Sequence, residues 1–256
     1  MNFSTKNTLF VGKVAIHLSR VDSTNEYAKR LISKSNPIEG TVIYASQQYA
    51  GRGQIGRRWH AQEAKNLTVS FIFKPNFLLA KSQFLLSQAV ALALYDLLLH
   101  YNFSTTAVKI KWPNDLYIRN RKIAGILIEN TLRGMYIDYS VIGIGLNVNQ
   151  SEFSRELKNP TSFLIERDKK FDLQKMFSQL CIALERWYLK LRARKEALIR
   201  QSYVKSMYLL NQKHLFTVVE NRETIEGIIR GVAQNGLLRL ETGKGIEEID
   251  LKTIIF

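Results

Sequence analysis

The sequence predicts an α+β protein in which helices pack on a mixed, largely antiparallel sheet, followed by a small all-β module. Segments of helical and strand periodicity follow one another without strict alternation up to about residue 206. Beyond that point short β-type segments alternate with glycines. The apolar fraction is 46% and the charged fraction 23%, as in ordinary proteins that bury a core. We therefore divide the chain into residues 1–206 and residues 207–256.

Three segments have the apolar spacing of helices. Residues 26–34 follow Asp22-Ser23-Thr24-Asn25, whose side chains suit a helix N-terminus. Residues 82–101 are rich in leucine and alanine, which predicts a helix that is mostly buried. Residues 172–203 carry one apolar stripe, with Cys181 on or beside it, and predict a single long helix.

Runs of apolar or alternating residues predict the strands. Residues 66–73 alternate and predict a strand that is buried on one face only. Residues 116–118 and 123–128 flank a polar turn and predict a hairpin. The other predicted strands are residues 41–45, 108–112 and 135–148 in the first part, and 215–219, 226–229, 236–240 and 248–251 in the second.

Composition excludes several classes of protein. One cysteine cannot form a disulfide framework or a cysteine metal site, and the four histidines lack metal-ligand spacing. No uninterrupted apolar run is long enough to span a bilayer, and residues 1–14 lack the features of a secretory signal. These features predict a cytoplasmic protein that does not bind membranes. The net charge of 37 − 22 = +15 suits a polyanionic partner or nucleotide, or simply a basic surface.

A loop rich in glycine and arginine begins at Gly51. Residues 51–56 match the dinucleotide fingerprint G-x-G-x-x-G, but a predicted strand follows instead of a helix, and residues 71–76 contain no acid. A Rossmann site is therefore not expected. Glycines allow close approach of a ligand, and Arg52, Arg57 and Arg58 supply forks for carboxylate or phosphate. The loop predicts anion binding, and the alternative is a basic surface turn.

The segment Lys111-Trp112-Pro113-Asn114-Asp115 ends one predicted strand, and Lys122 begins the second strand of the hairpin. The hairpin would bring Asp115 and Lys122 together. Aspartate is an oxygen ligand suited to Mg²⁺, and lysine is a mobile charge that suits a carboxylate or phosphate. An exposed ion pair at a turn explains these residues equally well.

Taken together, these blocks resemble the biotin–protein ligases. The matching residues are Ser23-Thr24-Asn25, Gln48, Gly51-Arg52-Gly53, Gly56-Arg57, Trp59, Lys111-Trp112-Pro113-Asn114-Asp115, Lys122-Ile123-Ala124-Gly125-Ile126-Leu127 and Gly143-Ile144-Gly145-Leu146-Asn147-Val148-Asn149. They cover about residues 20 to 150 in the family's order and approximate spacing. The resemblance implies a catalytic α+β domain followed by an SH3-like β-barrel.

The resemblance also implies the reaction and its substrates. The carboxylate of biotin attacks the α-phosphorus of ATP, with Mg²⁺ present, to give biotinyl-5′-AMP and pyrophosphate. A lysine amine of a biotin carboxyl carrier protein then attacks the mixed anhydride and releases AMP. An alternative of the same fold is a lipoate– or octanoate–protein ligase. An alternative from another class is a basic nucleic-acid-binding protein, which leaves the polar blocks unexplained.

Each residue of the blocks receives a role from the resemblance. Lys122, Arg52 and Asp115 are expected to be catalytic, with Asp115 also the metal ligand. Biotin binding is expected from Ser23, Thr24, Asn25, Gln48, Gly51, Arg52, Lys122, Gly125 and Gly145. Binding of ATP and the adenylate is expected from Arg52, Arg57, Trp59, Asn114, Lys122 and Asn147.

Two features set this sequence apart from some relatives. Gln54 stands where many relatives carry arginine, and a neutral donor predicts weaker retention of the adenylate phosphate. About twenty residues precede Ser23, too few for the helix-turn-helix domain with which some relatives repress transcription, so no sequence-specific DNA binding is expected. Several relatives pair their sheets as dimers, and a homodimer is consistent with the resemblance.

Overall fold

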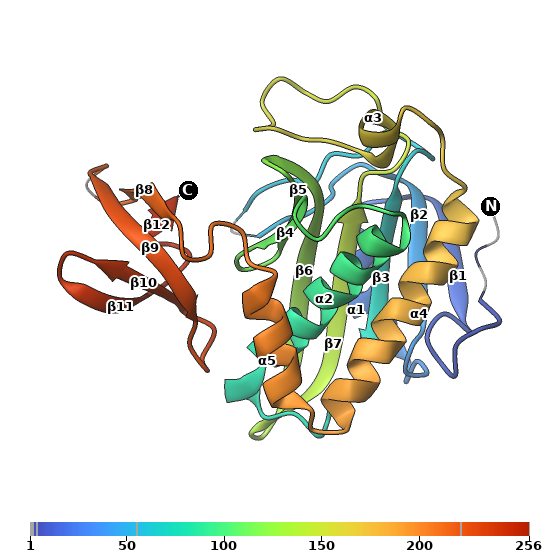
Figure 1. Cartoon of the computed structure of the whole chain (residues 1–256). Helices are drawn as coiled ribbons and strands as arrows, with labels where there is room; N and C mark the ends of the chain where they lie inside the picture. Colours follow the sequence, from blue (N-terminus) through green and yellow to red (C-terminus); the bar gives the residue numbers. More distant parts are fainter. Residues whose placement is uncertain (1–2, 4, 55, 221, 256) are drawn as a thin grey trace.

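The computed structural model describes residues 3, 5–54, 56–220 and 222–255. Within them, the first part of the chain forms a seven-stranded sheet in the order β1-β2-β3-β7-β6-β5-β4 (Figure 1). Only the pair β1–β2 is parallel, which confirms the mixed, largely antiparallel sheet. The strands are β1 (Ala15–Val21), β2 (Val42–Gln48), β3 (Leu67–Phe73), β4 (Val108–Lys111), β5 (Asp115–Ile118), β6 (Arg121–Arg133) and β7 (Tyr136–Leu146).

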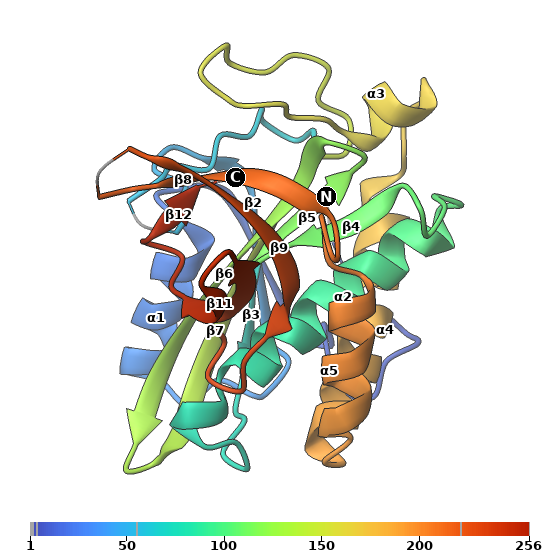
Figure 2. The ribbon, with the colours of Figure 1, turned by 60° about the vertical axis from the view of Figure 1, so that its left-hand side comes forward.

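Helices cover both faces of this sheet, as Figure 2 shows. On one face lie α2 (Phe84–His100), α4 (Leu173–Arg192) and α5 (Glu196–Lys205), and on the other lies α1 (Thr24–Lys34). The 3₁₀ helix η1 (Ala80–Ser82) precedes α2, and the short helix α3 (Phe163–Arg167) lies at one end of the sheet. The main core is packed between the sheet and α2 and α4.

The segment that contains helix α2 corrects the prediction that no apolar run is long enough to span a bilayer. The stretch Ala80–His100 is long and apolar enough to cross a membrane by length and composition. Most of it is buried inside the fold against the sheet, α4 and α5, as expected of a core helix.

Two predictions about the elements were wrong. Strand β3 is buried on both faces, because α1 covers the second face, where Thr68 and Ser70 lie. The predicted helix over residues 172–203 is two helices, since α4 ends at Arg192 and Arg194 takes the left-handed conformation with φ of 58°. Strand β1 and helix α3 were not predicted.

The end of the chain forms a second, antiparallel sheet in the order β11-β10-β9-β8-β12. Its strands are β8 (Lys213–Val218), β9 (Thr224–Val232), β10 (Leu238–Thr242), β11 (Gly245–Ile249) and β12 (Ile254–Ile255). It contacts the first part where the Trp112 indole donates a hydrogen bond to Gly236 O (2.9 Å). The all-β module is confirmed, while the boundary at residue 206 and the SH3-like barrel stay predictions.

Candidate active site

A strip of bare backbone crosses β6 and β7 on the face covered by α1. Gly125 of β6 pairs with Gly145 of β7, and Gly143 pairs with Leu127. Side chains alternate along a strand, so Ile142, Ile144 and Leu146 enter the main core while the glycines face α1. A Cβ on Gly143 would lie 2.3 Å from the Asn25 carbonyl oxygen Oδ1. The neighbours therefore lie directly on the backbone, which requires glycine.

A buried polar cluster lies at the N-terminus of α1, where Ser23, Thr24 and Asn25 are each less than 5% exposed. The Thr24 backbone N–H and hydroxyl donate to Gln48 Oε1 at 2.7 and 3.0 Å. The Asn25 amide donates to Leu127 O at 3.3 Å and to Glu129 at 2.8 Å. These bonds join α1 to β2 and β6, and fix the cluster beside the glycine strip.

Ser70 of β3 completes the cluster and was missed from the sequence. Its hydroxyl donates to Asn25 Oδ1 at 2.6 Å and lies 2.7 Å from Thr24 Oγ1. The available signal was that Thr68 and Ser70 interrupt an otherwise apolar strand on one face. Buried polar groups in such a strand need partners, which points to a covered polar site.

In the glycine–arginine loop, residues 51–54 and 56–59 form the two arms of a small hairpin. Gly53 N donates to Arg57 O at 2.7 Å, and Trp59 N donates to Gly51 O at 3.0 Å. A Cβ on Gly51 would lie 2.5 Å from Trp59 O, which explains the glycine. Gln54 lies at the tip and accepts a bond from Arg57 N at 3.1 Å, next to residue 55, which is outside the described residues.

The hairpin brings the Trp59 indole onto the glycine strip. A Cβ on Gly145 would lie 2.1 Å from Trp59 Cε2, and one on Gly125 would lie 3.1 Å from Cζ3. The indole Nε1 is buried and has no hydrogen-bond partner among the described residues. Lys122 Nζ lies 5.7 Å from the ring centroid, a cation–π distance. Trp59 therefore occupies the strip beside Lys122.

Asp115 and Lys122 meet across β5 and β6, with 2.6 Å between Oδ2 and Nζ. Their side chains are 18% and 30% exposed, and a Cβ on Gly125 would lie 3.4 Å from each. The pair thus lies at the glycine strip, partly buried. This location disfavours the alternative of an exposed ion pair at a turn.

Arg52 is held by acidic side chains near α1. It forms an ion pair with Glu26 and lies 4.0 Å from Glu129, while Lys29 contacts both acids at 2.7 and 2.9 Å. Burial raises the pKa of Glu129, but hydrogen bonds from Lys29 and Asn25 outweigh it, so the net pKa is lowered and the group is ionised. The structure does not bring Arg52 onto Lys122.

Asn147 and Asn114 have different surroundings. Asn147 is buried, and its amide donates to Thr161 O at 3.0 Å. Its Oδ1 is buried and lacks a partner within the described part of the chain, so it can accept a bond from a ligand. The Asn114 amide donates to Ile126 O at 2.6 Å and so ties the segment before β5 to β6.

Positive charge surrounds Asp115. Burial lowers the pKa of Lys111, and the charges of Lys122, Arg57 and Lys158 lower it further, against the opposing effect of Asp115. A site with this excess of cations favours an anionic ligand such as a phosphate chain. The described residues hold no cluster of three metal-ligating side chains. A single carboxylate nevertheless fits Mg²⁺, which is commonly held by one or two carboxylates and substrate phosphates.

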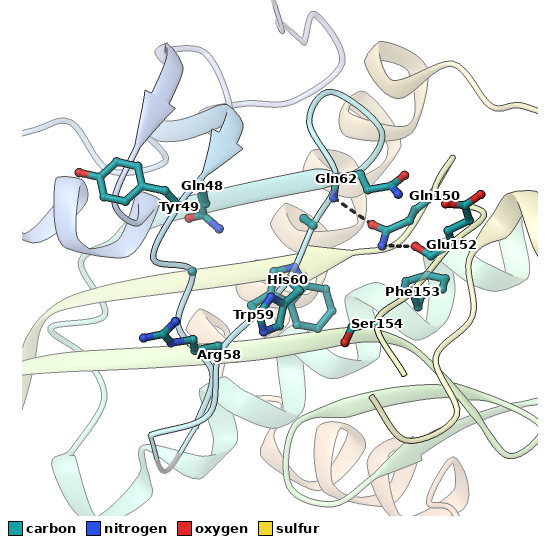
Figure 3. Close-up of a pocket in the computed structure, with 12 residues that line it drawn as sticks. Gln48, Tyr49, Arg58, Trp59, His60, Gln62, Gln150, Glu152, Phe153 and Ser154 are labelled. Atoms are coloured by element: carbon teal, nitrogen blue, oxygen red, sulfur yellow. Dashed lines mark hydrogen bonds between the residues drawn. The ribbon is translucent and has the colours of Figure 1, made fainter. Parts of the chain in front are cut away.

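A cavity of about 410 Å³ lies beside Trp59, between residues 48–62 and residues 150–154 (Figure 3). Gln150 joins its two sides, because Oε1 accepts from Gln62 N at 3.0 Å and Nε2 donates to Glu152 O at 2.8 Å. Its volume suits a small molecule. Residues 150–154 were not predicted as site residues. The lining residues are Gln48, Tyr49, Gly51, Arg58, Trp59, His60, Ala61, Gln62, Gln150, Glu152, Phe153 and Ser154.

Comparisons with known proteins agree with this site. The profile of the Biotin/lipoate A/B protein ligase family matches residues 18–147. The Biotin--[acetyl-CoA-carboxylase] ligase of Paracoccus denitrificans is 30% identical, over 93% of this chain and 99% of its own. The Bifunctional ligase/repressor BirA of Bacillus subtilis is also 30% identical, over 94% and 74%.

A solved structure is similar throughout. The biotin protein ligase from Aquifex aeolicus in complex with biotin and ATP is 27% identical, with a TM-score of 0.78, over 95% of this chain and 98% of that one. Sequence and fold thus agree over nearly the whole chain. The chain belongs to the biotin/lipoate A/B protein ligase family.

Proposed function

We propose that this protein activates biotin with ATP as biotinyl-5′-AMP and transfers the biotinyl group to a lysine amine of a biotin carboxyl carrier protein. The glycine strip carries this proposal. It runs from the buried polar cluster at α1 to Lys122 and Asp115. Biotin has the same order of groups, a polar ring system, an alkyl chain and a carboxylate. The similar proteins named above are biotin ligases, and the Aquifex aeolicus structure holds both substrates.

In this arrangement the polar cluster binds the ring system of biotin. Ser23 and Thr24 offer buried donors and acceptors, Gln48 is half-buried beside them, and Asn25 holds α1 against β6. Gly125 and Gly145 leave room for the alkyl chain once Trp59 has moved off the strip, and Gly51 begins the loop that closes over it. The polar cluster supports biotin over lipoate or octanoate, which carry no ureido group to bond.

Lys122 and Arg52 stabilise the negative charge of the first step. A biotin carboxylate oxygen bonds to the α-phosphorus of ATP while the bond to pyrophosphate breaks. Lys122 is already beside the strip, and Arg52 reaches the anion by exchanging its carboxylate partner Glu26 for the ligand. Mg²⁺, when bound, would neutralise phosphate charge, with Asp115 as its protein carboxylate.

The remaining residues hold the adenylate. The free Oδ1 of Asn147 is suited to accept a bond from the adenine amino group, and Arg57 lies in the charged surroundings of Asp115. Asn114 keeps Asp115 in place through β6. Trp59 and its hairpin cover the mixed anhydride, which water would otherwise hydrolyse. In the second step the carrier amine attacks the carbonyl, AMP leaves, and Asp115 accepts the amine proton.

Substitution of Lys122 tests these roles. We expect Lys122→Ala to stay folded and to form biotinyl-adenylate about 10²-fold more slowly in single turnover, because it loses a charge contact worth roughly 3 kcal/mol. The exposed Lys34, at the far end of α1, provides the matched control as Lys34→Ala. An unchanged rate in a folded Lys122→Ala protein would remove Lys122 from the mechanism.

Three finer properties belong to the same proposal. We propose that the protein acts in the cytoplasm, that it binds no operator DNA specifically, and that it is able to form a homodimer. The Bacillus subtilis relative is named a bifunctional ligase and repressor, so DNA binding is tested separately. A gel shift at physiological salt tests DNA binding, where weak salt-dependent association from the +15 charge is a separate effect. Sedimentation with and without biotin and ATP tests the dimer.

A further inference from the structure

The carboxylate of Glu166 lies at the centre of a polar cluster that the family blocks do not include. It belongs to α3, yet its side chain is only 2% exposed. It accepts a hydrogen bond from the Thr161 hydroxyl at 2.7 Å and pairs with Arg121 at 2.7 Å and Arg119 at 3.0 Å. Both arginines lie at the turn between β5 and β6, so Glu166 ties α3 to that hairpin.

The segment bonded to Glu166 also brackets Lys122. Lys122 N donates to Asn159 O at 2.8 Å, and Thr161 N donates to Lys122 O at 2.8 Å. On its other side Lys122 pairs with Tyr117 of β5. The backbone of Lys122 is therefore held on one side by residues 159–161 and on the other by β5. Glu166 contacts the first of these through Thr161 and the second through the arginines of the β5–β6 turn.

The same segment holds Asn147. Its amide donates to Thr161 O, and Asn147 N donates to Ile123 O at 2.9 Å. The backbone N–H of Thr161 thus bonds Lys122, and its backbone carbonyl bonds Asn147. A shift of Thr161 would displace the backbone of Lys122 and the side-chain amide of Asn147.

We propose that Glu166 is a positioning residue for adenylation, which sets Lys122 and Asn147 through Thr161. This inference rests on the proposed function. The two arginines are 68% and 41% exposed, so they can be hydrated if the carboxylate is removed. Thr161 is fully buried, so water cannot replace the hydrogen bond that its hydroxyl donates to Glu166. Removal of the carboxylate therefore disturbs Thr161 and the residues bonded to it, and leaves the outer ion pairs replaceable by water.

The expected effect is confined to the nucleotide end of the site. In Glu166→Ala, single-turnover adenylation falls about 10- to 100-fold and KM for ATP rises, since small displacements of reacting groups cost this much. The Kd for biotin stays within about twofold, because the polar cluster at α1 lies at the other end of the strip. Glu166→Gln keeps one acceptor oxygen for Thr161 and shows a smaller loss.

A matched control separates positioning from stability. Glu185 of α4 is also a buried carboxylate, and it accepts the backbone N–H groups of Leu9, Phe10 and Val11 at 2.7–3.1 Å. Its contacts lie at the N-terminal segment and not at Lys122. Glu185→Ala loses comparable hydrogen bonds, and we expect it to lower stability while leaving adenylation kcat and the KM for ATP unchanged.

Rapid-quench adenylation and calorimetric biotin binding are measured for four variants, which are Glu166→Ala, Glu166→Gln, Glu185→Ala and Lys122→Ala. Selective loss in the Glu166 variants supports the inference. Wild-type adenylation in Glu166→Ala, or an equal loss in Glu185→Ala, overturns it. If Glu166→Ala does not fold, Glu166→Gln decides, a loss supporting the inference and a wild-type rate overturning it. If Lys122→Ala also adenylates normally, there is no role of Lys122 for Glu166 to set and the inference is overturned, whereas failure of the wild-type protein to adenylate biotin would overturn the proposed function.

Discussion

Lys122 owes its direction to one extra residue in β6. Asp115 pairs with Gly125 and Tyr117 pairs with Lys122, so the register shifts between Leu116 and Tyr117. Without this bulge, residues 122 and 125 would face opposite sides of the sheet, because side chains alternate. With it, Lys122 and Gly125 share the face of the strip. Bulges are common beside active sites for this reason.

Trp59 allows the binding of biotin to be followed directly. Its indole covers Gly125 and Gly145, the strip proposed for the alkyl chain. Biotin alone must therefore displace it, and we expect tryptophan emission to shift to longer wavelength as the half-buried indole leaves the strip for water. Trp59→Phe should abolish the shift while Trp112 and Trp187 remain. The same shift in Trp59→Phe would show that biotin does not replace the indole.

At the scale of elements, the N-terminus of α1 places the polar cluster. The Asp22 carboxylate accepts a hydrogen bond from the Ser23 N–H at 2.8 Å. It also forms a bidentate ion pair with the guanidinium of Arg30, which lies further along α1. The Arg30 hydrogen bond is the largest effect and lowers the pKa of Asp22 to about 2. The start of the helix, and with it Ser23, is therefore fixed by an ionised aspartate.

This pair makes a pH-dependent contribution to stability. Because the pKa of Asp22 is lowered from 3.8 to about 2, the contribution is complete above pH 4 and is lost as the pH falls toward 2. We expect Asp22→Asn to lower the free energy of unfolding by about 1 kcal/mol at pH 7, allowing for solvent around Arg30. Urea unfolding from pH 7 to pH 2 measures it. In an Arg30→Ala background the substitution should have little effect, and a pH-independent difference would contradict the account.

Local patterns predicted most elements, and they failed where distant segments decide. The apolar run over residues 135–148 predicted β7, and the short motifs predicted the glycines and Lys122. Nothing near Arg194 in the sequence, neither glycine nor proline, marked the break between α4 and α5. The sequence pattern also missed the roles of Ser70, Gln150 and Glu166. Their partners Asn25, Gln62 and Arg121 lie far away in the sequence, and the spacing of apolar residues within one segment carries no information about such contacts.

At the scale of the whole molecule, the C-terminal sheet contacts the first part beside the Lys111-Trp112-Pro113-Asn114-Asp115 block. Trp112 is buried and bonds Gly236 O, and a Cβ on Gly236 would lie 2.8 Å from Phe84 Cγ at the start of α2. Gly236 also has φ of 96°, which side chains disfavour. One residue of the motif thus serves the contact between the two sheets, while its neighbours face the site.

Gly236→Ala tests this contact. We expect it to lower the free energy of unfolding by about 2 kcal/mol, because it combines overpacking against Phe84 with a strained backbone. Gly243→Ala is the matched control, since a Cβ on Gly243 would meet none of the described atoms within 4 Å and its φ is ordinary. Equal stability of the two variants in urea unfolding would show that the turn at Gly236 does not pack on α2 in solution.

The central claim, that the chain activates biotin with ATP, is tested most directly by biotin-dependent ATP–pyrophosphate exchange. Adenylation is reversible, so labelled pyrophosphate enters ATP only when the acid substrate is activated at the site. The account predicts exchange with biotin, little or none with lipoate or octanoate, and loss of exchange in Lys122→Ala. Absence of exchange with biotin, or exchange of equal rate with lipoate, would contradict it.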